Sequence, residues 1–322
     1  MKIAVVGATG KVGRMMLTCL DEFAVEIDKI DLYASKNSVD SIVEFRGQPL
    51  NVFETTTHSF DTGYDFVLFS AGGAVAKEFA PHAVNAGSVV IDNSSAFRRD
   101  DAIPLVVPEI NGHLLDGYKG IIANPNCSTI QLVLLLYPLS KYRKIKKIVV
   151  TTLQSVSGSG YKGIMEMQNQ RKGSAEVKCY TRQIDLNVIP QIGDIRDDLF
   201  CEEEAKMTSE TKKILGDSSI NLVATTVRVP VVYGHSESVY VEFEESVSID
   251  EIKDILSNTD AVSHSANYMT PIELGDSNLS HVSRIRYGGD RHSILFWNVA
   301  HNVRLGAATN AVKILKYMQK YS

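Results

Sequence analysis

One cysteine stands in a setting where a sulfur nucleophile is expected. Cys127 lies in the run Asn124-Pro125-Asn126-Cys127-Ser128-Thr129, directly before the apolar stretch Ile130 to Leu136. A loop rich in Pro and Asn that opens into a helix would place the sulfur at the helix N-terminus, where backbone N–H groups and the helix dipole favour the thiolate. Free cysteines are often simply buried. The assignment therefore depends on whether the chain also supplies a cofactor, a base and a substrate site.

The N-terminus has the pattern of a nucleotide-binding loop. An apolar strand, Lys2 to Val6, runs into Gly7-Ala8-Thr9-Gly10-Lys11-Val12-Gly13, and helical spacing follows from Arg14 to Asp21. Glycines let the backbone approach a pyrophosphate, and a helix N-terminus supplies N–H donors to it. We predict that every residue from Gly7 to Gly13 contributes to the cofactor site. The spacing is G-x-x-G-x-x-G rather than G-x-G-x-x-G, so a glycine turn in another α/β fold stays open.

No acidic residue follows the second predicted strand, Lys29 to Ala34. An Asp or Glu usually holds the ribose hydroxyls of NAD at this point, whereas here the chain continues Ser35-Lys36-Asn37-Ser38. Hydroxyl groups and an ammonium suit a 2′-phosphate. The sequence therefore predicts NADP as the cofactor, with Ser35, Lys36 and Ser38 beside it; the alternative is that Lys36 is a solvated loop charge.

Composition narrows the class of protein. The chain has 322 residues, 44% hydrophobic residues and a formal charge of −5, which gives enough apolar material for two cores and no basic excess for nucleic acid. We expect no nucleic-acid partner and, because no apolar stretch is long enough for a signal core or a span, no membrane association. The four cysteines have no C-x-x-C spacing, so we expect no metal site and a reducing, cytoplasmic location.

The order of predicted elements indicates two α/β domains. Through the first third, apolar strands alternate with helical segments, which is typical of a Rossmann-type parallel sheet covered by helices. Ser70, Ala71, Gly72 and Asn93 follow two of these strands, at the sheet edge where such folds bind ligands, so we expect them near the cofactor. After Cys127, long strands rich in Val, Ile and Thr predict a second α+β domain with a mixed sheet. The expected boundaries are 1–126, completed by a C-terminal helix at 303–322, and 127–302.

Together these motifs resemble those of the aspartate-semialdehyde dehydrogenases, most closely the bacterial branch. The resemblance covers nearly the whole chain and rests on the segments Gly7–Gly13, Asn93–Arg98, Val107–Asn111, Asn124–Thr129, Gln154–Gly158, Arg228–Val231, Gly234–Glu237 and Asn302–Ala308. Two positions depart from it. His301 stands where relatives usually carry an acidic residue, and Arg99 stands where an apolar residue is common.

The resemblance implies reversible, phosphate-dependent oxidation of L-aspartate 4-semialdehyde to L-4-aspartyl phosphate. The reductive direction serves the biosynthesis of lysine, threonine, methionine and isoleucine. In that chemistry the Cys127 thiolate forms a thiohemiacetal and then a thioester, Gln154 orients the substrate and His235 is the general acid/base. Gly234 would free the backbone for the bend that aims His235 into the site, and His235 is preferred over the seven other histidines.

The resemblance also assigns cations to two different anions. Arg228 would bind the substrate α-carboxylate, and Arg98 with Lys206 would bind phosphate. Glu203 would share the face of Lys206 on a helix predicted over Glu202 to Leu215 and pair with the substrate ammonium; the alternative is that it belongs to a solvated acidic helix start. Asn126 completes the predicted substrate site, and Ser157, Gly158 and Asn302 complete the predicted cofactor site.

Three alternative functions share part of this pattern. N-acetyl-glutamyl-phosphate reductase and glyceraldehyde-3-phosphate dehydrogenase share the chemistry, but they typically carry Gly-Cys and Ser-Cys-Thr-Thr-Asn at the nucleophile, unlike Asn126-Cys127-Ser128. A non-catalytic NADP-binding sensor or assembly subunit would need only the cofactor loop.

We expect a homodimer or homotetramer. The prediction rests on the family resemblance and on the apolar strand segment Leu222 to Val232, which would lie on an open sheet face.

Overall fold

The computed structural model describes residues 1–320, and Tyr321 and Ser322 lie outside the described part. The chain divides into two compact units, one formed by Met1–Asn126 with the segment from Ala307 onward and the other by Cys127–Gly306. The return to the first unit thus begins at Ala307, not at residue 303. Residues 303–306 belong with the second unit because Arg304 forms an ion pair with Asp276 there, with 3.3 Å between Nη1 and Oδ1.

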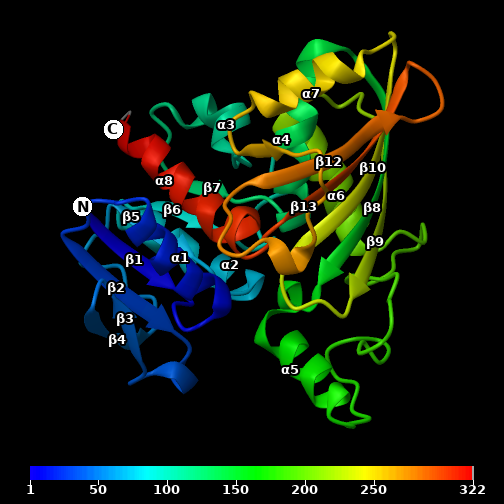
Figure 1. Ribbon diagram of the computed structural model, residues 1–322. Helices are drawn as coiled ribbons and strands as arrows, with labels where there is room; N and C mark the ends of the chain where they lie inside the picture. The colour runs from blue at the N-terminus through cyan, green and yellow to red at the C-terminus, as the bar shows by residue number, and fades with distance from the viewer. Residues whose placement is uncertain (321–322) are drawn as a thin grey trace. The chain divides into compact units, whose positions relative to one another are not determined.

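The first unit is a mostly parallel sheet with helices packed on it (Figure 1). Its strands are β1 (Lys2–Val6), β2 (Lys29–Ala34), β3 (Ile42–Phe45), β4 (Gln48–Glu54), β5 (Phe66–Phe69), β6 (Val89–Asp92) and β7 (Ile121–Ala123). They lie in the order β3-β4-β2-β1-β5-β6-β7, and only β3 runs antiparallel to its neighbour. The helices are α1 (Lys11–Glu22), η1 (Lys36–Ser38), α2 (Gly73–Asn85), α3 (Pro108–Asn111), η2 (Gly112–Leu115) and α8 (Asn310–Lys320).

The topology of this sheet gathers the predicted cofactor residues at one edge. β1, β2, β5 and β6 are parallel neighbours, so their carboxyl ends all point the same way. The glycine loop follows β1, Ser35 follows β2, Ser70 follows β5 and Asn93 follows β6. The central strands are buried on both faces, which explains why they read as continuous apolar runs.

The C-terminal helix closes the core of the first unit. Ala308, Val312 and Leu315 belong to the same buried cluster as Met16 and Leu20 of α1. The α-helix does not begin at the predicted residue 303, however. A π-helical segment, η5 (Arg304–Thr309), precedes α8, and the last two residues of the predicted 303–322 lie outside the described part.

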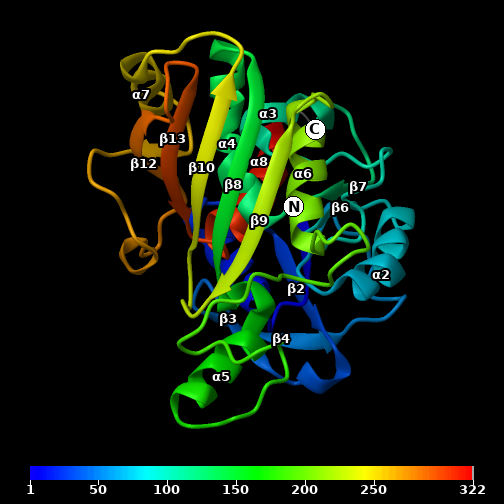
Figure 2. The ribbon, with the colours of Figure 1, turned by 90° about the vertical axis from the view of Figure 1, so that its right-hand side faces the viewer.

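The second unit is built on a mixed sheet. Its strands are β8 (Ile145–Ser155), β9 (Leu222–Val229), β10 (His235–Phe243), β11 (Val262–His264), β12 (Ser280–Tyr287) and β13 (Ser293–Ala300). They lie in the order β11-β12-β13-β10-β8-β9, and Figure 2 shows β12, β13, β10, β8 and β9 side by side. The helices are α4 (Cys127–Tyr142), η3 (Val156–Ser159), α5 (Gly160–Arg171), α6 (Glu202–Leu215), α7 (Ile249–Ser257), η4 (Pro271–Glu273) and η5. The mixed sheet and the bounds of α6 agree with the sequence predictions.

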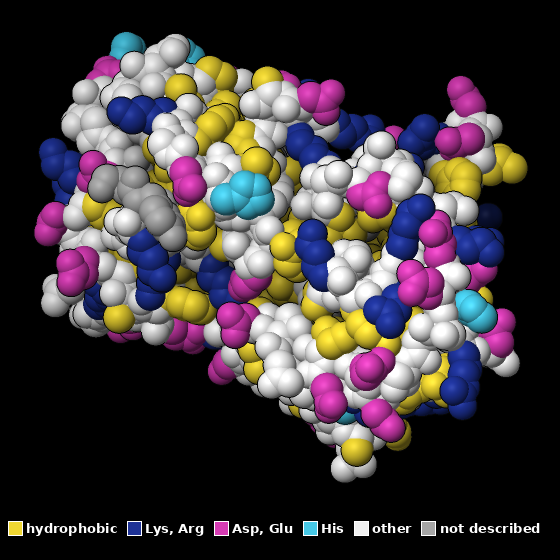
Figure 3. All heavy atoms as spheres, turned by 90° about the horizontal axis from the view of Figure 1, so that it is seen from above, with side chains coloured by type: hydrophobic (Ala, Val, Ile, Leu, Met, Phe, Trp, Pro, Cys, Tyr) yellow, Lys and Arg dark blue, Asp and Glu magenta, His cyan; other side chains and the backbone are white. Residues whose placement is uncertain are grey.

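The two faces of this sheet differ in what covers them. α4 and α6 pack on one face, and the strand residues that point to it alternate as buried positions along β8, β9 and β10. The other face is open and carries partly exposed apolar side chains, among them Val149 (37% exposed) and Val223 (38%). On the surface seen in Figure 3, acidic and basic side chains are interspersed.

Candidate active site

Cys127 is the first residue of α4, as the sequence predicted, and its side chain is partly exposed. The helix behind it is buried from Ser128 to Leu136 and apolar from Leu132 to Leu136, so Cys127 stands at the end of a well-packed element. Gly306 lies directly against it. A Cβ on Gly306 would come within 2.6 Å of the Cys127 Cβ, so only glycine permits this approach of η5 to Cys127.

His235 begins β10 after a sharp bend. Gly234 has φ +89 and permits the bend, and the imidazole is fully buried. The Ser155 N–H donates to His235 Nδ1 at 3.0 Å, which assigns the proton of the neutral ring to Nε2. His235 Nε2 has no hydrogen-bond partner within residues 1–320. Burial, and then the Arg228 cation, lower the pKa of His235 well below its usual range, so the ring presents an N–H donor while neutral.

Gln154 and Arg228 are direct neighbours on the parallel strands β8 and β9. Both are buried, and Arg228 Nη1 donates to the Ser155 carbonyl at 2.7 Å. Gly158 lies beside this pair. A Cβ on Gly158 would come within 2.8 Å of Arg228 Nη1 and 3.5 Å of His235 Nε2, so a larger residue there would fill the space beside the guanidinium and the imidazole.

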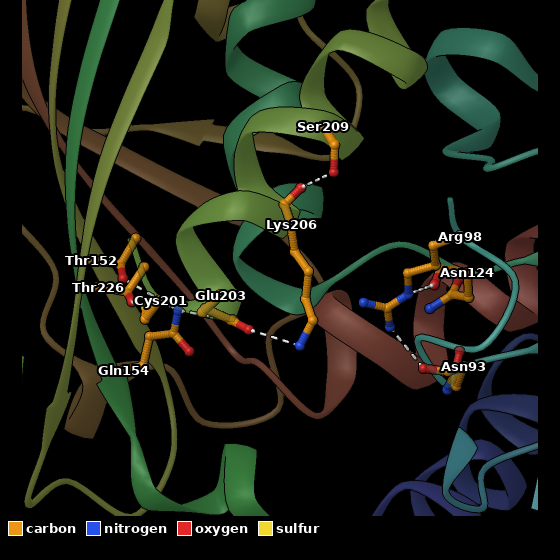
Figure 4. Close-up of polar contacts among 10 residues, drawn as sticks. All are labelled: Asn93, Arg98, Asn124, Thr152, Gln154, Cys201, Glu203, Lys206, Ser209 and Thr226. Carbon is orange, nitrogen blue, oxygen red and sulfur yellow. Dashed lines mark hydrogen bonds and ion pairs between the residues drawn. The ribbon is translucent and has the colours of Figure 1, made fainter. Parts of the chain in front are cut away.

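Glu203 and Lys206 share one face of α6, near Gln154 (Figure 4). Gln154 Nε2 donates to Glu203 Oε1 at 3.2 Å, and the Lys206 Nζ lies 3.7 Å from Glu203 Oε2. Glu203 is buried, 5% exposed, which is unlike a solvated acid at a helix start. The second unit therefore brings together a carboxylate, an ammonium and an amide on its helix-covered face, with the guanidinium of Arg228 beside the amide on the next strand.

Arg98 lies in the first unit and is held by backbone oxygens. Its Nε donates to the Asn124 carbonyl and its Nη2 to the Asn93 carbonyl, each at 2.8 Å (Figure 4). The turn before it is fixed by Asp92, whose carboxylate accepts from the Ser94 N–H at 3.0 Å and from the Ser94 hydroxyl at 2.6 Å. Asn126, the last residue of this unit, is buried, 6% exposed.

The glycine loop has the geometry of a cofactor cradle. Gly7 has φ +83, and a Cβ there would meet Ser70 Oγ at 2.8 Å. A Cβ on Gly13 would lie 2.2 Å from the Gly7 carbonyl, so α1 packs on β1 without room for a side chain. Gly10 is the N-cap of α1 and its first turn carries no side-chain cap, which leaves that helix end able to bind an anion. Ala8, Lys11 and Val12 lie in the same loop and first turn.

Three further segments of the first unit border this cradle. Thr9 Oγ1 lies 3.4 Å from Ser38 Oγ, which ties the glycine loop to η1 with Ser35 as its N-cap and Lys36 as its first residue. Gly72 is the N-cap of α2 directly after Ala71. Both amide atoms of Asn93 are buried and have no partner within residues 1–320. An unpaired buried amide beside a glycine cradle fits a dinucleotide.

Asn302 joins two segments of the second unit by hydrogen bonds. Its Oδ1 accepts from the Gly234 N–H at 3.0 Å and from Ser157 Oγ at 3.2 Å, and its Nδ2 donates to Ser157 Oγ at 3.0 Å. Both residues are buried. These bonds tie η3 to the bend before His235, a positioning role that the sequence analysis did not foresee for Asn302 and Ser157.

His301 and Ser155 complete the hydrogen bonding around Asn302. His301 Nδ1 accepts from the N–H groups of Val303 and Arg304, each at 3.3 Å, so it serves as an acceptor at the start of η5. Ser155 was missed as a functional residue, although its N–H holds His235 and its carbonyl holds Arg228. Its position inside the Gln154–Gly158 motif was the available signal.

No helix within residues 1–320 is long and apolar enough to cross a membrane. The same residues contain no group of three or more His, Cys, Asp or Glu side chains placed to hold a metal ion.

Two family models match the two units. Residues 2–118 match the model described as "Semialdehyde dehydrogenase, NAD binding domain", and residues 136–305 match "Semialdehyde dehydrogenase, dimerisation domain". The chain is therefore a two-domain semialdehyde dehydrogenase with an NAD(P)-binding first domain. It is also similar over 99% of its length to the aspartate-semialdehyde dehydrogenases of Aquifex aeolicus, at 42% identity over 98% of that protein, and Legionella pneumophila, at 43% over 96%.

Solved structures lead to the same family. The chain is similar to aspartate semialdehyde dehydrogenase II of Vibrio cholerae complexed with ASA, with TM-score 0.95, 40% identity and coverage of 99% and 98% of the two chains. It is also similar to the Candida albicans enzyme with NADP, with TM-score 0.77, 25% identity and coverage of 99% and 98%. The chain belongs to the aspartate-semialdehyde dehydrogenases, which are oxidoreductases.

Proposed function

We propose that this chain catalyses the reversible, NADP- and phosphate-dependent oxidation of L-aspartate 4-semialdehyde to L-4-aspartyl phosphate through a thioester on Cys127. The observation that carries the proposal is an unpaired nitrogen on His235. The imidazole is fully buried and neutral beside Arg228, and its Nε2 has no hydrogen-bond partner within residues 1–320. A buried donor without a partner is costly unless a ligand satisfies it. Similarity to enzymes of this name supports the substrate.

The chemistry follows from the groups at hand. The Cys127 thiolate adds to the aldehyde carbon, and the carbonyl π-electrons become an alkoxide on the thiohemiacetal. His235 Nε2–H donates to that oxygen, and backbone N–H groups at the start of α4 add to the stabilisation. A nicotinamide cofactor held by the glycine loop would supply the hydride acceptor for the oxidation and the hydride donor for the reverse reaction. Loss of hydride from the thiohemiacetal carbon leaves the thioester, and a phosphate oxygen then displaces the thiolate.

Binding roles are assigned by charge. Arg228 would hold the substrate α-carboxylate with both guanidinium nitrogens. Glu203 would receive the substrate ammonium, and its burial next to Gln154 and Lys206 supports that assignment over a solvated carboxylate. Lys206 and Arg98 would bind phosphate, and Asn126 would contact substrate. Gly158, predicted from the sequence as a cofactor residue, would also leave space for substrate beside Arg228.

For the cofactor we propose NADP over NAD. Lys36 and the hydroxyls of Ser35 and Ser38 follow β2 without an acidic residue, which supports binding of a 2′-phosphate. The remaining predicted contacts are Gly7, Ala8, Thr9, Gly10, Lys11, Val12, Gly13, Ser70, Ala71, Gly72, Asn93, Ser157, Gly158 and Asn302. In a cytoplasmic location the reductive direction would supply lysine, threonine, methionine and isoleucine biosynthesis.

We further propose a homodimer or homotetramer. The open face of the second sheet carries Val149 and Val223 partly exposed, and a partner copy on that face would bury them. Sedimentation at micromolar concentration should give an assembly of two or four chains. A stable monomer would contradict this.

The direct test is reduction of NADP by the purified chain with L-aspartate 4-semialdehyde and phosphate. We expect turnover that requires phosphate, that continues when arsenate replaces phosphate, and that is far slower with N-acetyl-glutamate semialdehyde. A chain that binds NADP yet reduces none with aspartate semialdehyde would instead be a cofactor-binding sensor. Preference for the acetylated substrate would reassign the enzyme.

A further inference from the structure

A buried polar cluster lies behind Cys127 and His235, and the proposed chemistry makes no use of it. Gln131 is one turn after Cys127 on α4, and Glu237 is two residues after His235 on β10. Asn298 of β13 and Ser280 of β12 complete the cluster, and all four side chains have 0% exposure. A fully buried carboxyl group in such a place requires an account of its hydrogen bonds.

The hydrogen bonds of this cluster leave two oxygens unsatisfied. Asn298 Nδ2 donates to Glu237 Oε2 at 2.9 Å, and Gln131 Nε2 donates to the His235 carbonyl at 3.3 Å. Glu237 Oε1 and Gln131 Oε1 have no partner within residues 1–320. Turning the Gln131 amide over would place its oxygen against the His235 carbonyl, so a flip does not solve the problem. One proton on Glu237 would satisfy both oxygens.

We propose that Glu237 is a neutral carboxylic acid that donates its O–H to Gln131 Oε1, and that this bond joins α4 to β10 and positions Cys127 relative to His235. The proposal deepens the proposed function and rests on it. Glu237 is a positioning residue, since it acts through the elements that carry the nucleophile and the imidazole.

The surroundings of Glu237 favour its protonated form. Burial raises the pKa of Glu237 to about 8, although the hydrogen bond from Asn298 works in the opposite direction. The side chains that face it are Gln131 from α4, Thr152 from β8, Ser280 from β12, Asn298 from β13 and, on β10 itself, His235. Of these only His235 titrates, and burial keeps it neutral. No cation from these elements stabilises a carboxylate.

A second buried glutamate of the same domain offers a matched contrast. Glu204 of α6 accepts from the Cys201 N–H at 2.8 Å and from the Thr226 N–H at 2.9 Å. Both of its oxygens therefore face donors, as a carboxylate requires. Glu204→Gln would turn an N–H₂ group toward an N–H group. Glu237→Gln would place an N–H₂ group where we infer an O–H.

The first measurement is the pH dependence of unfolding by urea for the full chain and its variants at one protein concentration. Between the ordinary carboxyl pKa and about 8, native Glu237 keeps a proton that the unfolded chain has lost. Stability of the wild type should therefore fall as pH rises, by up to about tenfold in the unfolding constant per pH unit. Glu237→Gln should lack this component. Equal slopes in the two proteins would overturn the proposal.

Glu204→Gln is the control for this measurement. It should be less stable than the wild type at every pH and should keep the wild-type slope. If Glu204→Gln removed the pH dependence of stability and Glu237→Gln did not, the buried proton would lie on Glu204, and the proposal would be wrong. Isotope-edited infrared spectroscopy gives an independent readout, because Glu237→Gln should remove a protonated carboxyl band at neutral pH.

The second measurement is the pH profile of turnover. At neutral pH, Glu237→Gln should keep kcat within about threefold of the wild type. In the wild type kcat should fall at alkaline pH as Glu237 ionises, and in Glu237→Gln this fall should move to higher pH, because glutamine cannot ionise. Glu237→Met should lower kcat by about tenfold with little change in the Michaelis constant for phosphate, because the bond between α4 and β10 is lost. Equal kcat for the Gln and Met variants would overturn the positioning role. If the chain turned over no semialdehyde at all, the proposed function would fail, while the unfolding slopes would still decide the proton on Glu237.

Discussion

The glycine cradle of the first unit (Gly7–Gly13) and the proposed active-site cluster of the second (Cys127, Gln154, Glu203, Arg228 and His235) are built by opposite means. The cradle is backbone: Gly7 adopts φ +83, and the missing side chain of Gly13 is what lets α1 approach the Gly7 carbonyl. The cluster is made mostly of buried side chains that hold one another, with Gln154 on Glu203 and Arg228 on the Ser155 carbonyl. Adding atoms should therefore damage the cradle, and removing polar atoms should damage the cluster.

The largest effect is expected at the nucleophile of the cluster. Cys127→Ser should keep the fold, because serine is accepted at a helix start, yet lose activity by several orders of magnitude, because the hydroxyl is almost fully protonated at neutral pH. Steady-state turnover and NADP binding measure the two parts. Burial raises the pKa of Cys179, so Cys179→Ser serves as the control and should leave turnover and inactivation by iodoacetamide unchanged. Near-normal turnover of Cys127→Ser would remove the mechanism.

The two anion sites should respond differently. Arg228→Leu removes the proposed carboxylate contact and should impair every substrate in both directions by about 30- to 150-fold, equivalent to about 2–3 kcal/mol. Lys206→Leu and Arg98→Leu should mainly raise the Michaelis constants for phosphate and aspartyl phosphate. Initial rates with each substrate varied in turn separate these cases. If the Michaelis constant for phosphate were unchanged in both the Lys206 and Arg98 variants, this phosphate site would be rejected. The proposed chemistry at Cys127 would not be affected.

Adding one methyl group tests the cradle. Gly13→Ala would force a Cβ to within 2.2 Å of the Gly7 carbonyl and should destabilise the first domain by about 1–3 kcal/mol. Gly72→Ala is the control, since a Cβ there meets nothing within 4 Å. Chemical unfolding of both variants gives the comparison. Equal stability of the two would mean that the backbone of the loop is less constrained than its contacts indicate.

The smallest expected effect concerns one charge beside the cradle. Lys36→Glu should weaken the binding of NADP by about tenfold and the binding of NAD much less. The new carboxylate would repel a 2′-phosphate but could accept a hydrogen bond from a ribose hydroxyl. Calorimetric titration with each dinucleotide measures both affinities. If the wild type binds NAD as tightly as NADP, our interpretation of Ser35 to Ser38 is wrong.

The contrast also explains what the sequence could predict. The cradle is one contiguous motif, so its strand, loop and helix could be assigned from local spacing, and α6 was placed over Glu202–Leu215 by the same means. The cluster depends on strand register. That Gln154 pairs with Arg228, that Ser155 holds His235, and that Gly306 approaches Cys127 are non-local facts that spacing does not contain.

Local motifs do not show which hydrogen-bond partners a side chain has in the fold. Asn302 and Ser157 were predicted beside the cofactor, and that role remains a prediction, but the structure uses both side chains inside the second domain to hold the bend at Gly234. Glu237 also stands in a motif, Gly234–Glu237. Its protonation state became a question only because the structure leaves one oxygen of Glu237 and one of Gln131 without a hydrogen-bond partner. Hydrogen-bond partners, unlike residue types, require the fold.

The most direct test of the central claim is a single-turnover experiment without phosphate. Wild-type enzyme mixed with NADP and L-aspartate 4-semialdehyde should release a burst of NADPH close to one per active subunit and then nearly stop, because no acceptor removes the acyl group. Mass spectrometry of the quenched protein should find the aspartyl adduct on the peptide that contains Cys127, and added phosphate should discharge it. A burst with the adduct on another residue, or full turnover with no adduct and no phosphate, would contradict a thioester on Cys127.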